Sequence, residues 1–198
     1  MSALAELNAE IERCRACELA KHRIKVVPGE GPEHAKLLFI GEAPGHFEDQ
    51  SGRPFVGPAG QYLDQLLGLI GLKRNQVFIA NVIKCRPPEN RDPLPGELLA
   101  CSKWLERQLE VLKPRVIVTL GRYSMAKYFP GESISKVHGR ARRTGNHVCF
   151  AMYHPAAALH QGSLRKVIEA DILKLPGVLA EADKVEETQE RPNQLSLF

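Results

Sequence analysis

The chain has 198 residues, of which 43% are hydrophobic, 25% charged and 6% aromatic. This length is enough for one domain with its own core, and the apolar fraction excludes an intrinsically disordered protein. No apolar run approaches the ~18 residues of a membrane-spanning helix, and the first residues lack the basic-then-apolar pattern of a signal peptide. We therefore expect a cytoplasmic protein that makes no contact with a membrane.

Hydrophobic periodicity predicts helices and strands in alternation along the chain. The first helix places Leu4, Leu7 and Ile11 on one face, with Ser2 as its cap. In chain order the predicted elements are a helix at 3–13, a strand at 36–40, a helix at 59–70, a strand at 77–80, a helix at 98–112, a strand at 116–120, a short helix at 123–129, a strand at 147–152 and a helix at 163–180. Residues 181–198 are polar and acidic without periodicity, which predicts a disordered tail after a domain of residues 1–180.

Charge is unevenly divided between the predicted domain and its tail. The formal net charge of the chain is +4. Residues 181–198 hold five acidic and two basic side chains, which gives −3 and leaves +7 on residues 1–180. A basic domain suits a polyanionic partner, but charge alone leaves open a surplus that serves only solubility.

The alternation of strands and helices predicts an α/β fold with a parallel sheet covered on both faces. Ligands of such sheets bind at the carboxyl ends of the strands. The segments at these ends are Gly41-Glu42-Ala43-Pro44-Gly45, Asn81, Gly121-Arg122 and Tyr153-His154-Pro155. We expect them to meet at one rim and to form a pocket there.

Four of the five cysteines have the spacing of metal ligands. Cys14 and Cys17 are separated by two residues, which lets both thiolates reach one metal centre, and Cys85 and Cys101 are separated by fifteen. Cys149 lies within an apolar strand and is expected to be a buried core thiol. The spacing leaves open zinc, an iron–sulfur cluster and unrelated thiols.

Taken together, these motifs resemble those of the family 4 uracil-DNA glycosylases, a branch of the uracil-DNA glycosylase superfamily. The resemblance runs from Cys14 to about Lys174, and it rests on the order and spacing of CRAC (14–17), GEAPGHFED (41–49), SGRPFVGPAG (51–60), NVIKCRPPENR (81–91), Cys101 and YHPAAAL (153–159). It implies a three-layer α/β/α sandwich around a four-stranded parallel sheet. It also implies a structural 4Fe–4S cluster on Cys14, Cys17, Cys85 and Cys101, with no redox step in catalysis.

The resemblance implies hydrolysis of the bond between uracil and deoxyribose after the base leaves the DNA stack. Phe55 resembles the aromatic residue that stacks on uracil, and Asn81 the amide that pairs with uracil O4 and N3–H. Backbone groups of Gly41, Glu42 and Ala43 resemble the rest of the uracil-binding cradle. His154 resembles the donor that stabilises negative charge on uracil O2 as the bond breaks. Without the resemblance, a core Phe, a capping Asn and a structural His would be the ordinary interpretations.

A residue that activates water is harder to identify. Other branches of the superfamily carry Asp or Asn at the position of Ala43, which cannot act as a base. The carboxylates in reach are Glu42, Glu48 and Asp49, and Glu42 is the first choice because it lies on the predicted rim. All three could instead have only positional roles.

Basic residues beside the motifs are candidates for contact with DNA phosphates. The candidates are Lys84, Arg86, Arg140, Arg142 and Arg143. Solvated loops are the alternative for most of them. Leu159, in the segment after His154, could wedge into the duplex or equally belong to the core.

The last residues form a short pattern of their own. Gln194, Leu195, Leu197 and Phe198 resemble the peptide that binds the bacterial sliding clamp, placed at the end of an acidic linker. The alternative is a tail that folds back onto the domain. A monomer in the prokaryotic cytoplasm, associated with the nucleoid, is the expected setting.

Three other functions compete with uracil excision. A crosslinking relative traps its product through a His in a loop inserted between the counterparts of Asn81 and Cys101, but residues 82–100 contain no His. A non-catalytic DNA-binding module that keeps the cluster is disfavoured by the presence of Phe55, Asn81 and His154. An iron–sulfur oxidoreductase with a dinucleotide cofactor is disfavoured because the chain lacks GxGxxG.

Overall fold

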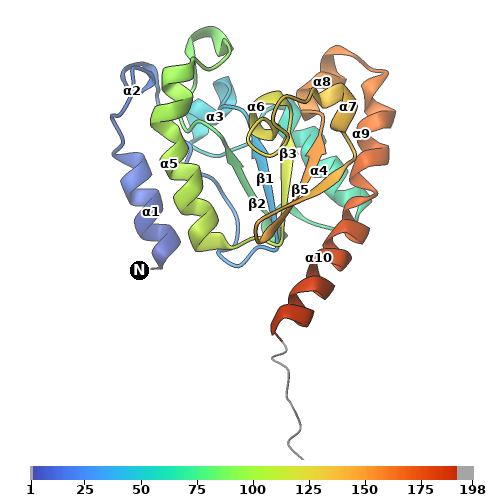
Figure 1. The fold of residues 1–198 in the computed structure, drawn as a ribbon. Coiled ribbons are helices and arrows are strands. Elements are labelled where there is room, and N and C mark those ends of the chain that lie inside the picture. The colour runs from blue at the N-terminus through green and yellow to red at the C-terminus, as the bar shows by residue number, and fades with distance from the viewer. Residues whose placement is uncertain (1, 191–198) are drawn as a thin grey trace, which may run out of the picture.

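A computed structural model describes residues 2–190 of the chain as helices packed on both faces of a central sheet (Figure 1). The sheet has five strands in the order β2-β1-β3-β5-β4. Strands β2, β1, β3 and β5 are parallel to one another, and β4 pairs antiparallel with β5. The strands are β1 (Leu37–Gly41), β2 (Phe78–Asn81), β3 (Val116–Leu120), β4 (Ala141–Thr144) and β5 (His147–Met152).

The helices form the two outer layers. Helices α1 and α5 lie on one side of the sheet, and α4, α9 and α10 lie on the other (Figure 1). The helices are α1 (Ala3–Glu12), α2 (Leu19–His22), α3 (His46–Ser51), α4 (Pro58–Leu69), α5 (Pro95–Leu112), α6 (Arg122–Met125), α7 (Ile134–Val137), α8 (Pro155–His160), α9 (Leu164–Ile172) and α10 (Leu175–Glu190), with short 3₁₀ turns η1 (Arg74–Gln76) and η2 (Pro88–Asn90). The predicted α/β sandwich is confirmed.

Each central strand is buried on both faces, which is why its sequence is a continuous apolar run. In β1, Leu37 and Phe39 pack with side chains of α4, α9 and α10, and Leu38 and Ile40 pack with side chains of α1, α5 and α7. Successive residues of a strand point to opposite faces, so one five-residue segment contributes to both halves of the core. This double burial fixes the sheet and therefore the position of the loops at its carboxyl ends.

Strand β4 is an addition to the four parallel strands that the sequence predicts. All four of its residues are exposed, and its sequence is Ala-Arg-Arg-Thr. Such a strand has no hydrophobic alternation to detect, and charged side chains on an edge strand discourage pairing with another chain. The strand also means that Arg142 and Arg143 lie in the sheet, although the sequence predicts a loop there.

The sequence predicts a disordered tail from residue 181, and the structure corrects this for its first part. Helix α10 continues to Glu190. Ala182 is buried in the core beside the sheet. Asp183 lies 2.8 Å from the Lys36 ammonium and 3.8 Å from Arg115 Nε, so the acidic residues begin inside a docked helix. Within residues 2–190, no helix combines the length and apolar character needed to cross a membrane.

Candidate functional site

A cavity of about 710 Å³ opens at the carboxyl ends of the parallel strands. It brings together Glu42 from the end of β1, Asn81 from the end of β2, Arg122 from the end of β3, His154 from the end of β5 and Phe55 from the loop between α3 and α4. The sequence predicts that the segments after β1, β2, β3 and β5 converge, because the carboxyl ends of parallel strands meet at one edge of the sheet. The structure shows it, and it adds the Phe55 loop as a further wall.

Asn81 presents an unsatisfied acceptor to this cavity. Its side chain is 1% exposed, and its Oδ1 has no hydrogen-bond partner among the described residues. Gly41 pairs with Asn81 across the two strands, and a Cβ on Gly41 would lie 2.4 Å from Asn81 Oδ1 and 2.6 Å from Phe55 Cζ. Only glycine therefore allows the amide and the ring to approach one another. A buried acceptor without a partner is costly, which points to a ligand that donates an N–H group there.

His154 is held as a neutral donor. It caps the N-terminus of α8, where its Nδ1 accepts a hydrogen bond of 3.1 Å from the backbone N–H of Ala156. The proton of the neutral ring is therefore on Nε2. Burial lowers the pKa of His154 to about 4, and the negative charge of Glu48 opposes this shift only partly. The imidazole is thus uncharged at neutral pH, and its ring stacks on Phe55 with centroids 5.4 Å apart.

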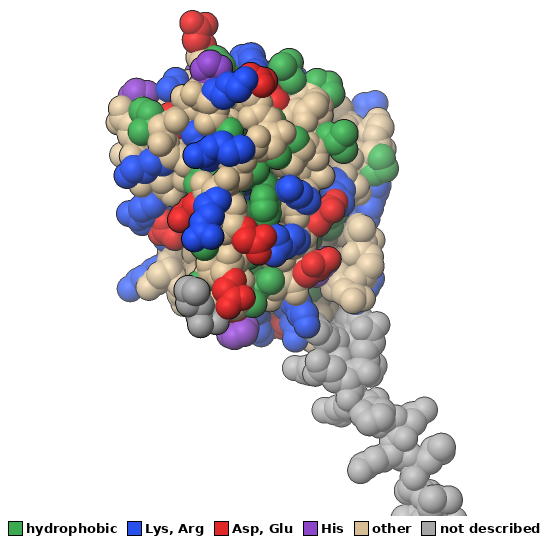
Figure 2. Space-filling view, turned by 90° about the vertical axis from the view of Figure 1, so that its left-hand side faces the viewer, with side chains coloured by type: hydrophobic (Ala, Val, Ile, Leu, Met, Phe, Trp, Pro, Cys, Tyr) green, Lys and Arg blue, Asp and Glu red, His purple; other side chains and the backbone are tan. Residues whose placement is uncertain are grey.

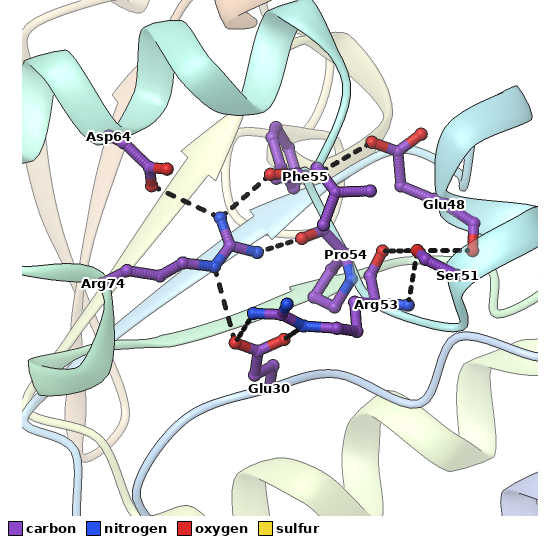
Figure 3. Close-up of polar contacts among 9 residues, drawn as sticks. Glu30, Glu48, Ser51, Arg53, Pro54, Phe55, Asp64 and Arg74 are labelled. Atoms are coloured by element: carbon purple, nitrogen blue, oxygen red, sulfur yellow. Dashed lines mark hydrogen bonds and ion pairs between the residues drawn. The ribbon is translucent and has the colours of Figure 1, made fainter.

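Glu48 on α3 fixes the loop that carries Phe55 (Figure 3). Its Oε1 accepts hydrogen bonds from the backbone N–H groups of Val56 and Gly57 at 2.8 and 2.9 Å. Its Oε2 accepts another from Gly45 at 3.1 Å. Three backbone donors thus occupy this carboxylate, so its role in the structure is to hold the loop.

The other two candidate carboxylates have different environments. Asp49 is 3% exposed, accepts a hydrogen bond of 3.0 Å from the backbone N–H of Ile24, and does not line the cavity. Glu42 is half-buried and lines the cavity. Burial raises the pKa of Glu42, the nearby Asp92 adds to this effect, and Arg122 opposes it. Of the three candidates, Glu42 is the one whose carboxylate remains available on the rim.

The four cysteines with ligand spacing line a second, smaller cavity beside α5. Cys14 and Cys17 lie after α1, Cys85 lies after β2, and Cys101 is on α5. Trp104 Nε1 donates to Cys14 Sγ at 3.3 Å, which is within range for sulfur. Cys149 lies apart from this group, fully buried in β5, as the sequence predicts.

This cavity is surrounded by apolar side chains. Cys85 and Cys101 belong to a buried cluster with Leu7, Ile11 and Trp104. Burial raises the pKa of the Cys85 thiol and raises that of Cys101 to about 11. Charged donors oppose these shifts, among them Arg23, whose Nη1 lies 3.1 Å from Cys85 Sγ. Among residues 2–190, no three His, Cys, Asp or Glu side chains come close enough together to bind one metal ion.

Comparisons with known proteins agree with this arrangement. The Uracil DNA glycosylase superfamily profile matches residues 28–173. A type-4 uracil-DNA glycosylase from Sulfurisphaera tokodaii is 46% identical over 185 residues, which cover 88% of this chain and 84% of the relative. Similar proteins with the same name come from Archaeoglobus fulgidus, 46% identical over 88% of this chain and 92% of the relative, and from Thermotoga maritima, 42% identical over 86% and 92%.

The chain belongs to the type-4 uracil-DNA glycosylase family. This confirms the resemblance that the motifs indicate. The motifs contain the pocket residues Glu42, Phe55, Asn81 and His154, whereas Arg122 lies outside them. The residues predicted to contact DNA differ in their environments.

The prediction of a DNA contact is wrong for Lys84. Its side chain is 1% exposed, and its Nζ donates to the backbone carbonyl of Asn81 at 2.8 Å and to Gln108 Oε1 at 2.7 Å. Burial lowers the pKa of Lys84 to about 8, and the nearby Cys101 opposes that shift. Both acceptors belong to buried residues, so the side chain points into the fold and supports the end of β2 instead of facing DNA.

The four arginines predicted to contact DNA lie in different places. Arg86 lies by the pocket, where its guanidinium bonds Asn90 Oδ1 at 2.7 Å and lies 3.3 Å from His46 Nδ1. Arg140 is exposed in the loop before β4. Arg142 is ion-paired with Glu132 and lies over the ring of Phe129.

Arg143 is remote from the pocket at the strand ends. It lines a separate cavity together with His147, Lys113 and Pro114. In the sheet it pairs with Val148, near the amino ends of β3 and β5. The structure therefore does not bring Arg142 and Arg143 to the pocket, and contact with DNA phosphates stays a prediction for the four arginines.

Figure 2 shows the face formed by α1, α2 and α5, with Lys and Arg side chains spread over it and acidic side chains among them. Ion pairs account for part of this mixture: Arg107 lies 2.5 Å from Glu10, and Lys21 lies 2.8 Å from Glu18. The positive charge of the chain is thus partly neutralised on this face.

Two exposed apolar side chains lie on short helices near the pocket. Leu159 on α8 is 51% exposed, which excludes its alternative role in the core and leaves the predicted wedge open. Phe47 on α3 is 53% exposed, and the sequence did not single it out. The residues resembling a clamp-binding peptide, Gln194 to Phe198, lie outside the described part of the chain.

Sequence reasoning missed Asp92 at the rim and Arg74 behind the Phe55 loop. Asp92 forms an ion pair with Arg122 and lines the pocket. Signals existed for Arg122, which follows the end of β3, and for Asp92, which directly follows the motif at 81–91. Nothing local in the sequence connects Arg74 to the motifs.

Proposed function

We propose that this chain hydrolyses the bond between uracil and deoxyribose in DNA and leaves an abasic site. The observation that carries the proposal is the buried, unpaired Oδ1 of Asn81, next to Phe55 and His154 in one cavity. An amide offers one acceptor and one donor, which match N3–H and O4 of uracil. Cytosine presents the opposite pattern at these atoms, so the same amide disfavours it.

Phe55 provides the surface on which the extruded base stacks. A base can be reached only after it leaves the duplex stack, and a stacking partner offsets part of that cost. Its ring is already parallel to within 28° of the His154 ring, on the same wall of the cavity. The base therefore meets an ordered aromatic surface.

His154 stabilises the leaving group. Its neutral ring donates from Nε2, because Nδ1 is engaged by Ala156. Negative charge on uracil O2 grows as the glycosidic bond breaks, so this hydrogen bond strengthens most in the transition state. The low pKa of His154, about 4, keeps the ring from holding a positive charge before the base arrives.

Glu42 orients the attacking water or stabilises the positive sugar. Its carboxylate lines the cavity and, unlike Glu48, is not occupied by backbone donors in the hydrogen bonds of the described residues. Its pKa is raised by burial, so the carboxylate is a better proton acceptor than a solvated glutamate.

The four thiols of Cys14, Cys17, Cys85 and Cys101 fit a 4Fe–4S cluster. They line one cavity enclosed by apolar side chains, and N–H donors from Trp104 and Arg23 reach two of the sulfurs. A cluster binds each thiolate through a different iron, so its ligands surround a volume instead of meeting at one ion. When bound, the cluster supplies iron–thiolate bonds that cross-link the segment after α1, the loop after β2 and helix α5.

The end of the chain is proposed to recruit the protein to a sliding clamp through Gln194, Leu195, Leu197 and Phe198. The support is the sequence pattern after an acidic segment. Deleting residues 194–198 is expected to abolish clamp binding and leave turnover on short oligonucleotides unchanged. Clamp affinity that survives the deletion would show that these residues are not the contact.

The decisive experiment incubates the purified protein with an oligonucleotide that contains one uracil and measures alkali-labile strand breaks. We expect breaks at the uracil position and none in matched oligonucleotides with thymine or cytosine there. The Asn81→Ala variant serves as the control for the site. Binding of uracil-containing DNA without any strand breaks would contradict the proposal and favour a non-catalytic module.

A further inference from the structure

Phe55 has a backbone conformation that its residue type disfavours. Its φ is +51°, in the left-handed region, and its side chain is buried. A bulky residue in that region is strained and persists only where its surroundings impose the conformation. The contacts that impose it at Phe55 must therefore come from the rest of the fold.

Arg74 binds both peptide groups that flank Phe55. It belongs to η1 and reaches the Phe55 loop from nineteen residues further along the chain. Its Nη1 donates to the Phe55 carbonyl at 2.9 Å, and its Nη2 donates to the Pro54 carbonyl (Figure 3). The orientations of these two peptide planes define φ and ψ of Phe55. One guanidinium therefore holds both dihedral angles.

The far side of the loop is held by the opposite charge. Glu48 Oε1 accepts from the Val56 N–H at 2.8 Å. The peptide group between Phe55 and Val56 thus has a cation at its oxygen and an anion at its nitrogen. Gly60 on α4 packs against the same group, since a Cβ there would lie 1.8 Å from the Phe55 oxygen. The peptide group is fixed from three directions.

Arg74 is itself held in place by two carboxylates. Its Nη1 lies 3.3 Å from Asp64 Oδ1, and its Nε lies 3.6 Å from Glu30 Oε1. Glu30 is anchored to β2 through backbone hydrogen bonds with Ile79 at 2.8 and 2.9 Å. The pKa of Glu30 lies below its ordinary value. Hydrogen bonds from Arg53 are the largest cause, burial opposes them, and the charge of Arg74 lowers the pKa further. The carboxylate therefore stays charged and keeps the guanidinium aimed at the loop.

We propose that Arg74 is a positioning residue for base stacking, because it holds Phe55 in the strained conformation that presents its ring to the pocket. This inference rests on the proposed function, in which Phe55 stacks on the extruded uracil. Arg74 touches neither the pocket nor the base, so it acts only through Phe55. Loss of Arg74 should let the loop relax to an ordinary backbone conformation and move the ring away from the base.

The test is a double-mutant cycle of Arg74→Met and Phe55→Ala, with kcat/KM for a uracil-containing oligonucleotide as the measurement. Base–aromatic stacking is worth about 1–3 kcal/mol, so Phe55→Ala should lower kcat/KM by roughly 5- to 150-fold. Arg74→Met should cause a loss within that range in the wild-type background. In the Phe55→Ala background it should change kcat/KM by less than about twofold, because no ring is left to position.

Arg53→Met is the matched control. Arg53 pairs with the same Glu30, at 2.7 Å, but its exposed guanidinium contacts no carbonyl of Pro54 or Phe55. We expect its kcat/KM to stay within about twofold of wild type. Affinity for an oligonucleotide with an abasic site, which has no base to stack, should be equal in wild type and Arg74→Met.

A merely structural role for Arg74 would lower kcat/KM by the same factor in both backgrounds, and this additivity would overturn the inference. If Arg74→Met does not fold, Arg74→Lys decides through the same cycle, because an ammonium keeps the charge but cannot bridge two carbonyls in the same way. Failure of the proposed function is a separate result, since the wild-type protein would then form no abasic sites.

Discussion

The pocket at the strand ends and the cysteine cavity are built on opposite principles. The pocket contains an acceptor without a partner at Asn81, a strained backbone at Phe55 and a neutral, half-buried ring at His154. The cysteine cavity is enclosed by apolar side chains, and two of its sulfurs receive N–H donors. The first region keeps an unpaired acceptor open for a base, whereas the second groups four thiols, two of which receive donors from the protein and all of which are proposed to hold a structural cluster. Unpaired and strained groups in a binding site lower the stability of the fold, and well-satisfied regions elsewhere compensate for that loss.

The two regions meet at residues 81–85. Asn81 faces the pocket, Cys85 faces the cysteine cavity, and the buried Lys84 lies between them. The ammonium of Lys84 holds the Asn81 carbonyl and helix α5 through Gln108. We therefore expect a substitution on one side of this segment to affect the other side as well, and this coupling makes the contrast testable.

The largest effect on activity is expected in the pocket. His154→Ala removes the proposed donor to uracil O2, and the loss of one such donor lowers the rate about 10²–10³-fold. Single-turnover cleavage of a uracil-containing oligonucleotide measures the change, with thermal unfolding as the check on folding. Cleavage by this variant at the wild-type rate would remove His154 from the mechanism.

The largest effect on stability is expected in the cysteine cavity. Cys101→Ser should abolish the visible absorbance and iron content of the purified protein and lower Tm by roughly 10 °C, because ligand loss removes folding free energy. Cys149→Ser is the matched control, since Cys149 is equally buried but lies outside the cavity. Equal iron in wild type and Cys101→Ser would show that Cys101 is not a ligand.

An intermediate effect on both properties is expected at Lys84. Lys84→Met leaves the Asn81 carbonyl and Gln108 Oε1 without their donor, which costs about 1–3 kcal/mol for a buried group. We expect a lower Tm together with weaker kcat/KM for uracil-containing DNA. Lys127→Met, which breaks an exposed ion pair of 3.0 Å with Glu106, should change neither measurably. A drop in Tm with unchanged kcat/KM would show that Lys84 does not couple the two regions.

The effect that is absent at neutral pH is a pH dependence of stability. The pKa of His154 falls from its ordinary 6.5 to about 4 on folding. Between these values the unfolded chain binds a proton that the folded chain does not, so stability declines as pH falls through this window, by at most about 1.4 kcal/mol per pH unit. Chemical denaturation of wild type and His154→Asn from pH 7 to 4 tests this, with a shallower decline expected for the variant. Parallel curves would contradict the shift.

Much of the site could be predicted from the sequence, because its groups follow strand ends. Asn81 and His154 come directly at the ends of short apolar runs, and parallel strands must bring their carboxyl ends to one rim. The spacing of Cys14 and Cys17 likewise has a local meaning. The same argument wrongly predicted a DNA contact for Lys84, because a lysine beside a motif is ordinarily solvated.

The sequence by itself determined the α/β alternation, the rim and the family, since these depend on periodicity and on residues close together in the chain. Only the tertiary structure decided where Lys84 points, that Arg74 reaches the Phe55 loop, that β4 joins the sheet and that α10 extends past residue 181. Three of these depend on a partner far along the chain, namely Gln108, Phe55 and Lys36. Strand β4 instead pairs with its neighbour β5 across residues 145–146, and its exposed polar sequence carries no strand pattern. Burial and charge pairing between such partners come into existence only when the chain folds, so no local pattern records them.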